Sequence, residues 1–202
     1  MIIKKIAKMC RERKTLLSTY FRGTTLWVGT YSALYALNGL PDMTGAQIAV
    51  MFDFSDKLQK DINYTNADIL DLPISQEFAG EIRLDEPDEV IVSGSEVKVF
   101  RYGERILFCD ADLFEPMKDL NENVGLFYYL RKWRGSDIIA VHSGLELVAL
   151  IMPRLMQLDS MKDWCDKQRQ LIVDIESYVA QIALEQTEEA DENQMTIEGR
   201  DE

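Results

Sequence analysis

The chain has 202 residues, of which 47% are hydrophobic and 28% are charged, and its formal net charge is −13 at pH 7. This apolar content is too high for a disordered protein, and the length suits one domain with appendages. The acidic balance argues against general affinity for a nucleic-acid backbone. The sequence also lacks a run of about 20 apolar residues, which argues against a transmembrane helix.

The cysteines bear on the compartment. Cys10, Cys109 and Cys165 are odd in number and lie far apart. They match neither a disulfide framework nor a CxxC metal or redox pair, which predicts a reducing compartment. The basic N-terminus has no uninterrupted apolar segment of the signal-peptide kind. We therefore expect a cytoplasmic protein.

The N-terminus predicts an amphipathic helix. Apolar side chains fall near one helical face of residues 2–17 and basic ones on the other, so residues 1–20 are assigned to an N-terminal helix. Six bases and one acid lie between Lys4 and Lys14. Packing on the chain's own domain is the simplest interpretation, and contact of this basic patch with a membrane surface or with nucleic acid is the alternative.

Residues 21–153 are expected to form one α+β domain. Its first half predicts strands at 24–28 and 31–37, a helix at 46–52 with Thr44 as N-cap, and a helical turn or loop at 55–72. From residue 78 the apolar period changes to two. The segments that follow predict strands at 78–84, 89–92, 96–101, 105–109, 124–132, 137–141 and 145–151, interrupted by a helix at 110–120 that Pro116 shortens. Turn pairs such as Ser93-Gly94 favour antiparallel hairpins.

The C-terminal part predicts a long helix over residues 154–186, because apolar residues keep a heptad pattern from 158 to 186. Such a helix would be about as long as the domain itself. Docking on the chain's own sheet and self-association with a second copy are the two alternatives. The acidic segment 187–202 is expected to be disordered.

Few residues suggest catalysis. His142 is the only histidine, and its place before Ser143-Gly144 favours a hairpin turn over a catalytic role. Asp110 and Asp112 could hold a divalent cation as a DxD pair, or could cap and charge the first turn of the helix that follows. We assign no catalytic, cofactor-binding or metal site residue, and we expect no cofactor.

The order of the expected elements repeats once. A strand at 31–37, a helix at 44–54 and three strands between 78 and 101 are followed by a strand at 105–109, a helix at 110–120 and three strands between 124 and 151. This doubled β-α-β-β-β unit with antiparallel sheets resembles one domain of the sliding DNA clamps. The resemblance implies a non-enzymatic replication factor, although the two helices assigned to the unit hold only one base, Lys118.

The sequence therefore predicts a non-enzymatic interaction or assembly protein, in the form of a clamp-like accessory factor of bacterial or phage DNA replication. The alternative is a carboxylate-dependent metal enzyme that uses Asp110 and Asp112. The expected partner is a protein, with homo-oligomerisation through the C-terminal helix as one option, and neither nucleic acid nor a membrane is a favoured partner.

Overall fold

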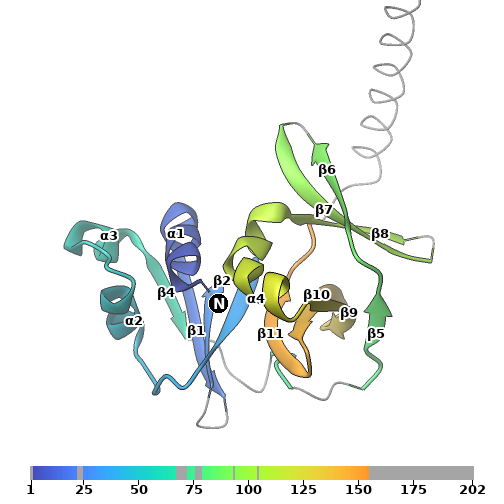
Figure 1. Cartoon of the computed structure of the whole chain (residues 1–202). Coiled ribbons are helices and arrows are strands. Elements are labelled where there is room, and N and C mark those ends of the chain that lie inside the picture. The colour runs from blue at the N-terminus through green and yellow to red at the C-terminus, as the bar shows by residue number, and fades with distance from the viewer. Residues whose placement is uncertain are drawn as a thin grey trace, which may run out of the picture. The chain divides into compact units, whose positions relative to one another are not determined.

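The computed structural model describes residues 2–21, 25–66, 72–75, 79–92, 94–103 and 105–154. The chain divides into two compact units, Met1–Leu155 and Met156–Glu202, and the described residues all belong to the first. The expected C-terminal helix and the acidic segment after it lie outside the described residues. In chain order the first unit holds α1 (Ile3–Arg13), β1 (Thr15–Phe21), β2 (Thr25–Thr30), β3 (Ala33–Asn38), α2 (Gly45–Met51), α3 (Asp56–Asp61), β4 (Asn63–Asn66), β5 (Ile82–Leu84), β6 (Asp88–Val92), β7 (Ser95–Tyr102), β8 (Arg105–Asp110), the 3-10 helix η2 (Ala111–Met117), α4 (Lys118–Asn123), β9 (Leu126–Trp133), β10 (Ser136–Ser143) and β11 (Glu146–Ile151) (Figure 1).

The N-terminal helix is shorter than predicted. It ends at Arg13, because Lys14 takes a left-handed conformation with φ 48° and closes the last turn. The assignment of residues 1–20 to one helix was therefore wrong in its second half, where Thr15–Phe21 forms β1. This segment is rich in Thr, Tyr and Phe, residues that favour strands.

The larger sheet has eight strands in the order β4-β1-β2-β3-β11-β10-β9-β5. Its pairs are antiparallel except at one edge, where β4 runs parallel to β1. The expectation of purely antiparallel sheets is corrected to a mixed sheet at this point. The strand β4 was not predicted, because it is short and mostly exposed, and an edge strand of this kind has no clear apolar period.

The middle of this sheet is symmetric in its order. Its six middle strands have the order β1-β2-β3-β11-β10-β9. Three strands in chain order are thus followed by three strands in the reverse of chain order. β3 and β11 meet antiparallel at the centre, as a two-fold axis through that pair would require. A helical segment precedes each set of three, α1 before β1 and η2 with α4 before β9. Both segments pack on the same face of the sheet (Figure 1).

A second sheet of three antiparallel strands, β6-β7-β8, carries two of the predicted hairpins. Phe100 on β7 turns toward the helices and contacts the rings of Phe114 and Tyr128, with centroids 6.0 and 5.1 Å away. The last residue of β8 is Asp110, and η2 starts at the next residue. The predicted helix at 110–120 is thus a 3-10 helix that continues as α4, with Pro116 inside η2.

The two faces of the large sheet bury two separate cores. The first core lies between the sheet and the helices, and it includes Ile6 and Cys10 of α1, Ile48 of α2 and Met117 of η2. The second core lies on the opposite face, where Trp27 and Leu34 pack with Ile74. The predicted N-cap Thr44 is confirmed, because its Oγ1 accepts from the backbone N–H of Gln47.

In the described part of the chain, no helix has the length and apolar character needed to cross a membrane.

Candidate functional site

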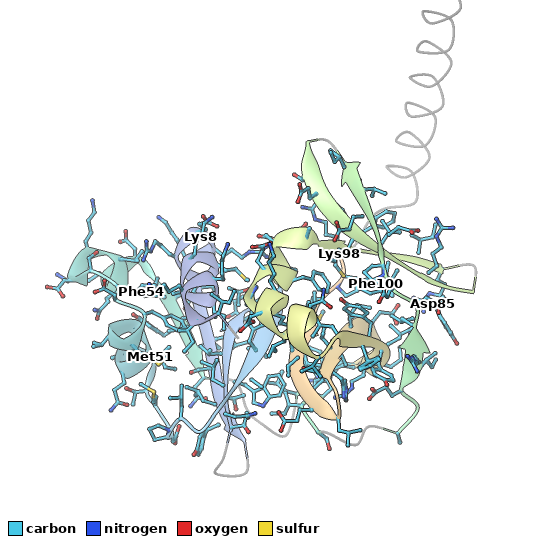
Figure 2. The ribbon with its side chains drawn as sticks, in the orientation of Figure 1. Lys8, Met51, Phe54, Asp85, Lys98 and Phe100 are labelled. Carbon is cyan, nitrogen blue, oxygen red and sulfur yellow. The ribbon has the colours of Figure 1, made fainter. Side chains whose placement is uncertain are left out.

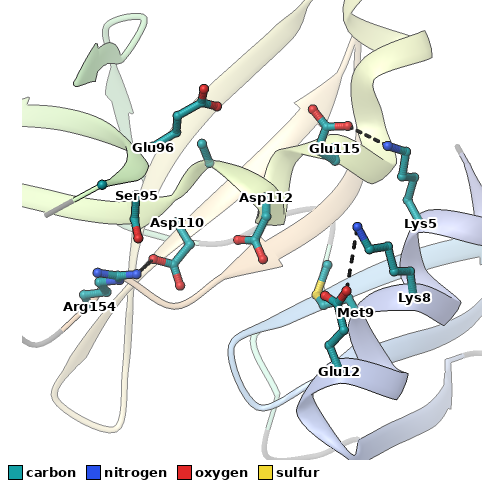
Figure 3. A pocket seen from close by; sticks show the side chains of 12 residues that line it. Lys5, Lys8, Met9, Glu12, Ser95, Glu96, Asp110, Asp112, Glu115 and Arg154 are labelled. Atoms are coloured by element: carbon teal, nitrogen blue, oxygen red, sulfur yellow. Dashed lines mark hydrogen bonds and ion pairs between the residues drawn. The ribbon is translucent and has the colours of Figure 1, made fainter. Parts of the chain in front are cut away.

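A cavity of about 570 Å³ lies between α1, η2 and the start of β7, and we call it the α1–η2 cleft. This volume is in the range of small-molecule sites. Figure 3 shows Lys5, Lys8 and Glu12 projecting from α1 on one side and Asp112 and Glu115 from η2 on the other. Charged side chains of both signs line the cleft.

Asp110 and Asp112 both line this cleft. They lie at the junction where β8 ends and η2 begins. Asp112 lies in the first turn of η2, where the sequence expects a carboxylate to charge that turn. Asp110 stands at the N-cap of η2 but makes no side-chain capping hydrogen bond. The Nη2 of Arg13, the last residue of α1, lies 3.4 Å from Oδ2 of Asp110 and 3.3 Å from Oδ2 of Asp112. Arg154 pairs with the other carboxylate oxygen of Asp110 (Figure 3).

These ion pairs decide what the two aspartates can do. A divalent cation here would have to displace Arg13, because the guanidinium already bridges the two carboxylates that the metal would need. Within the residues that the structure describes, no three His, Cys, Asp or Glu side chains come together as a metal site. Through these ion pairs, Asp110 and Asp112 connect α1 to the β8–η2 junction, and Asp110 also connects Arg154 to it.

The first helix presents a basic stripe. Lys4, Lys8 and Arg11 are exposed and spaced i, i+4 and i+7, which places them on one side of α1. Figure 2 shows Lys8 at the outer surface of this helix. Lys5 pairs with Glu115 at 2.9 Å and Arg13 with the two aspartates, whereas Lys8 lies 3.7 Å from Glu12 on the same helix. We use the name basic stripe for Lys4, Lys8 and Arg11 below.

His142 is placed differently from the prediction. It is the seventh of eight residues of β10, 8% exposed, and the turn begins only at Gly144. Its Nε2 lies 3.3 Å from Nη2 of Arg131 and 3.3 Å from Oε1 of Glu81. Burial lowers the pKa of His142, the Glu81 charge opposes this shift, and the Arg131 charge adds a smaller lowering. The side chain is thus part of a buried polar cluster on the second face of the sheet.

Arg131 at the centre of that cluster was missed by sequence reasoning. Its side chain is fully buried and pairs with Glu81 at 2.8 Å. The surrounding residues 126–133 alternate aromatic, aliphatic and basic side chains, so a charged residue there predicts a solvent-facing position. No local pattern marks it, because its partners lie at residues 73–81 and 142.

The described cysteines have no nucleophilic character. Cys10 and Cys109 are both fully buried and free. Burial raises the pKa of each thiol to about 12, so the thiolate that would attack a substrate is absent near neutral pH. Both serve as small apolar residues of the first core.

Comparison of the chain with protein-family models, with curated proteins and with solved structures finds no match.

Proposed function

We propose that the protein is a non-enzymatic interaction and assembly factor, a clamp-like accessory factor of bacterial or phage DNA replication. The observation that carries this proposal is the pair of helical segments, α1 and η2 with α4, that lie together on one face of a sheet whose strand order is symmetric about β3 and β11. Sliding clamps use such paired helices to face DNA, and the basic stripe gives one segment of this pair a suitable charge.

The first of the two repeated units in the fold contains a different helix from the one that the sequence predicts. The sequence predicts the helix at 44–54 as the helical member of this copy, and that helix has no base with which to face DNA. In the fold, α2 packs at the edge of the sheet beside β1 and β4, whereas α1 lies beside η2. The helix that supports the proposal is thus α1, with its three exposed bases.

The side chains with catalytic potential support a non-enzymatic role through their contacts. Asp110 and Asp112 are held by Arg13. His142 is held in the cluster with Arg131. A reaction at either place would first have to break contacts that connect separate elements of the fold.

The DNA-facing part of the proposal is tested by charge reversal on the stripe. Fluorescence anisotropy with a labelled DNA duplex at low salt compares the intact chain with Lys4→Glu, Lys8→Glu and Arg11→Glu combined. We expect the affinity to fall and the slope of log K against log[salt] to drop by roughly three, since each neutralised phosphate contributes about 0.9. The matched control is Lys57→Glu with Lys60→Glu on α3, also exposed.

Absence of binding by the intact chain at low salt would contradict the DNA-facing role. An equal loss of affinity in the α3 control would show that the effect reflects overall charge only.

A clamp must also encircle the DNA, which a second experiment tests. Protein held on a nicked DNA circle should be released when the circle is cut, whereas ordinary groove or backbone binding does not depend on free ends.

Closure around DNA requires several copies, and we propose self-association through residues 158–186, whose heptad pattern suits helix pairing. Light scattering on the intact chain and on Ile175→Asp measures this. A monomeric mass for the intact chain at micromolar concentration would contradict it.

The metal-enzyme alternative is tested by isothermal titration with Mg²⁺ or Mn²⁺. Saturable binding that Asp112→Ala abolishes and Asp56→Ala retains would replace the proposal with that alternative, because Asp56 is an exposed aspartate outside the α1–η2 cleft.

A further inference from the structure

A short segment, residues 72–75, lies against the second face of the large sheet, and we call it the strap. Ile74 at its centre is 1% exposed and belongs to the second core. Leu72 and Pro73 form one wall of an apolar pocket of about 100 Å³. The sheet supplies the other walls, chiefly through Leu17, Leu34, Trp133, Ile138 and Leu150. The strap thus covers apolar side chains that would otherwise face water.

The guanidinium of Arg131 binds the strap through hydrogen bonds. A guanidinium has five N–H donors, and each N–H of Arg131 has an acceptor within the cluster. Both N–H groups of Nη1 point to strap carbonyls, that of Pro73 at 2.6 Å and that of Ser75 at 2.9 Å. Nε donates to Oε2 of Glu81 at 2.9 Å, and Nη2 is shared between Glu81 at 2.8 Å and Nε2 of His142 at 3.3 Å.

The contact with Arg131 favours a neutral His142. Its Nε2 can accept from Arg131 only when it carries no proton, and the ring also makes a hydrogen bond with the backbone of Leu145. Protonation would turn Nε2 into a donor and set two cations 3.3 Å apart. Glu81 could still accept from the ring, but the carboxylate would then be shared between two competing cations.

Among the described residues, the His142 ring also contacts an aromatic side chain. The ring of Tyr129 on β9 meets it edge-on with centroids 4.9 Å apart. On β5, Arg83 pairs across from Tyr129, and its guanidinium lies over the ring of Phe127, 5.3 Å from the centroid. Among the described residues that these contacts connect, Glu81 is the one carboxylate, and it faces Arg131 and His142.

We propose that Arg131, Glu81 and His142 form a proton-sensitive latch, which keeps the strap closed while His142 is neutral and releases it, uncovering the apolar side chains beneath, when His142 is protonated. The observation behind it is geometric: one imidazole nitrogen lies within hydrogen-bonding distance of both the guanidinium that holds the strap and the carboxylate that pairs with that guanidinium.

The direction of the effect follows from linkage. With the strap closed, the pKa of His142 is lowered, and with the strap open a solvated imidazole has a pKa of about 6.5. The open state therefore binds more protons, so closure is fully favoured above about pH 6.5 and is weakened as the pH falls below it. One proton can change the equilibrium by at most about tenfold per pH unit.

The first test measures strap opening through Ile74→Cys in the full chain. Labelling of this thiol by a disulfide reagent is followed by mass spectrometry of the peptide that holds residue 74, and each rate is divided by the rate in urea at the same pH. We expect this protection to fall roughly fivefold between about pH 7.5 and about pH 5.5, a single-proton effect. The matched control adds His142→Gln, whose side-chain oxygen can accept from Arg131 but does not titrate.

Protection that stays constant with pH, or that falls equally in the His142→Gln background, would overturn the proposal. The second test needs no substitution. The chain has a single histidine, so one imidazole resonance reports His142 in the unmodified protein. A pKa below the usual value near 6.5 agrees with the latch, and a value at or above it would refute the latch even if the variants fail to fold.

Discussion

Replacing Arg131 by Met should be among the most destabilising single changes in the first unit. Met fills a similar elongated space with apolar atoms, so the cavity contribution is small. The main cost is that three groups lose the guanidinium as their partner. These are the carboxylate of Glu81, whose side chain is 14% exposed, and the carbonyls of Pro73 and Ser75. Removing one member of a buried ion pair costs about 3 to 5 kcal/mol, because the other charge stays buried without its partner.

The pH dependence of this loss follows from His142. In the variant the Arg131 charge no longer lowers the pKa of His142, while the Glu81 charge still raises it. The folded variant should therefore bind a proton at His142 more readily than the original protein. Since that imidazolium can replace the guanidinium beside Glu81, the free-energy difference between the two proteins should shrink as the pH falls from about 8 toward about 5.5.

Urea unfolding at both pH values, followed by circular dichroism and tryptophan fluorescence, measures this difference. The double-mutant cycle with Glu81→Gln isolates the pair, and we expect the double variant to lose less than the sum of the two single losses. A loss below about 1 kcal/mol for Arg131→Met at about pH 8 would refute the account, because exposed ion pairs have that magnitude. A loss that grows at low pH would refute the part assigned to His142.

Three further predictions concern the packing around the first core. Tyr35→Phe should cost about 1 to 3 kcal/mol in urea unfolding, because the buried hydroxyl donates to the carbonyl of Leu113 at 2.8 Å, which then loses its partner. Gly29→Ala should lower stability by about 3 kcal/mol, since its Cβ would come 2.1 Å from a backbone oxygen of β3. Gly45→Ala is the control, where the obstacle is the partly exposed ring of Tyr64, and a comparable loss there would contradict the backbone explanation. The two buried thiols should resist alkylation at about pH 8 until urea is added, and labelling of the native chain at either would contradict their burial.

The hairpins show where sequence alone was sufficient. The predicted strands at 96–101, 105–109 and 137–141 lie within β7, β8 and β10. Each is bounded by a turn glycine with positive φ, as at Gly94, Gly103 and Gly144. Alternation of apolar side chains and the conformational freedom of glycine both act over a few residues, so they can be read locally.

The error at the N-terminus shows a local signal that was overridden. Apolar positions in residues 2–17 continue the helical period past Arg13, yet the chain turns at Lys14 into β1. The pairing of β1 with both β2 and β4 supplies hydrogen bonds to each edge of this segment. Such pairing depends on strands up to about fifty residues away, which a helical window cannot include.

The sequence by itself determined the mixed α+β class, the antiparallel hairpins and the small number of residues with catalytic potential, because these depend on composition and short-range pattern. The tertiary structure decided which residues meet. It placed α1 in contact with η2, joined Asp110 and Asp112 to Arg13, and buried Arg131 between the strap and His142. These contacts join residues from 11 positions apart, Arg131 and His142, to 114 positions apart, Ile2 and Pro116. The physical reason is that a charge is stable inside a protein only beside its partners, and the fold alone brings those partners together.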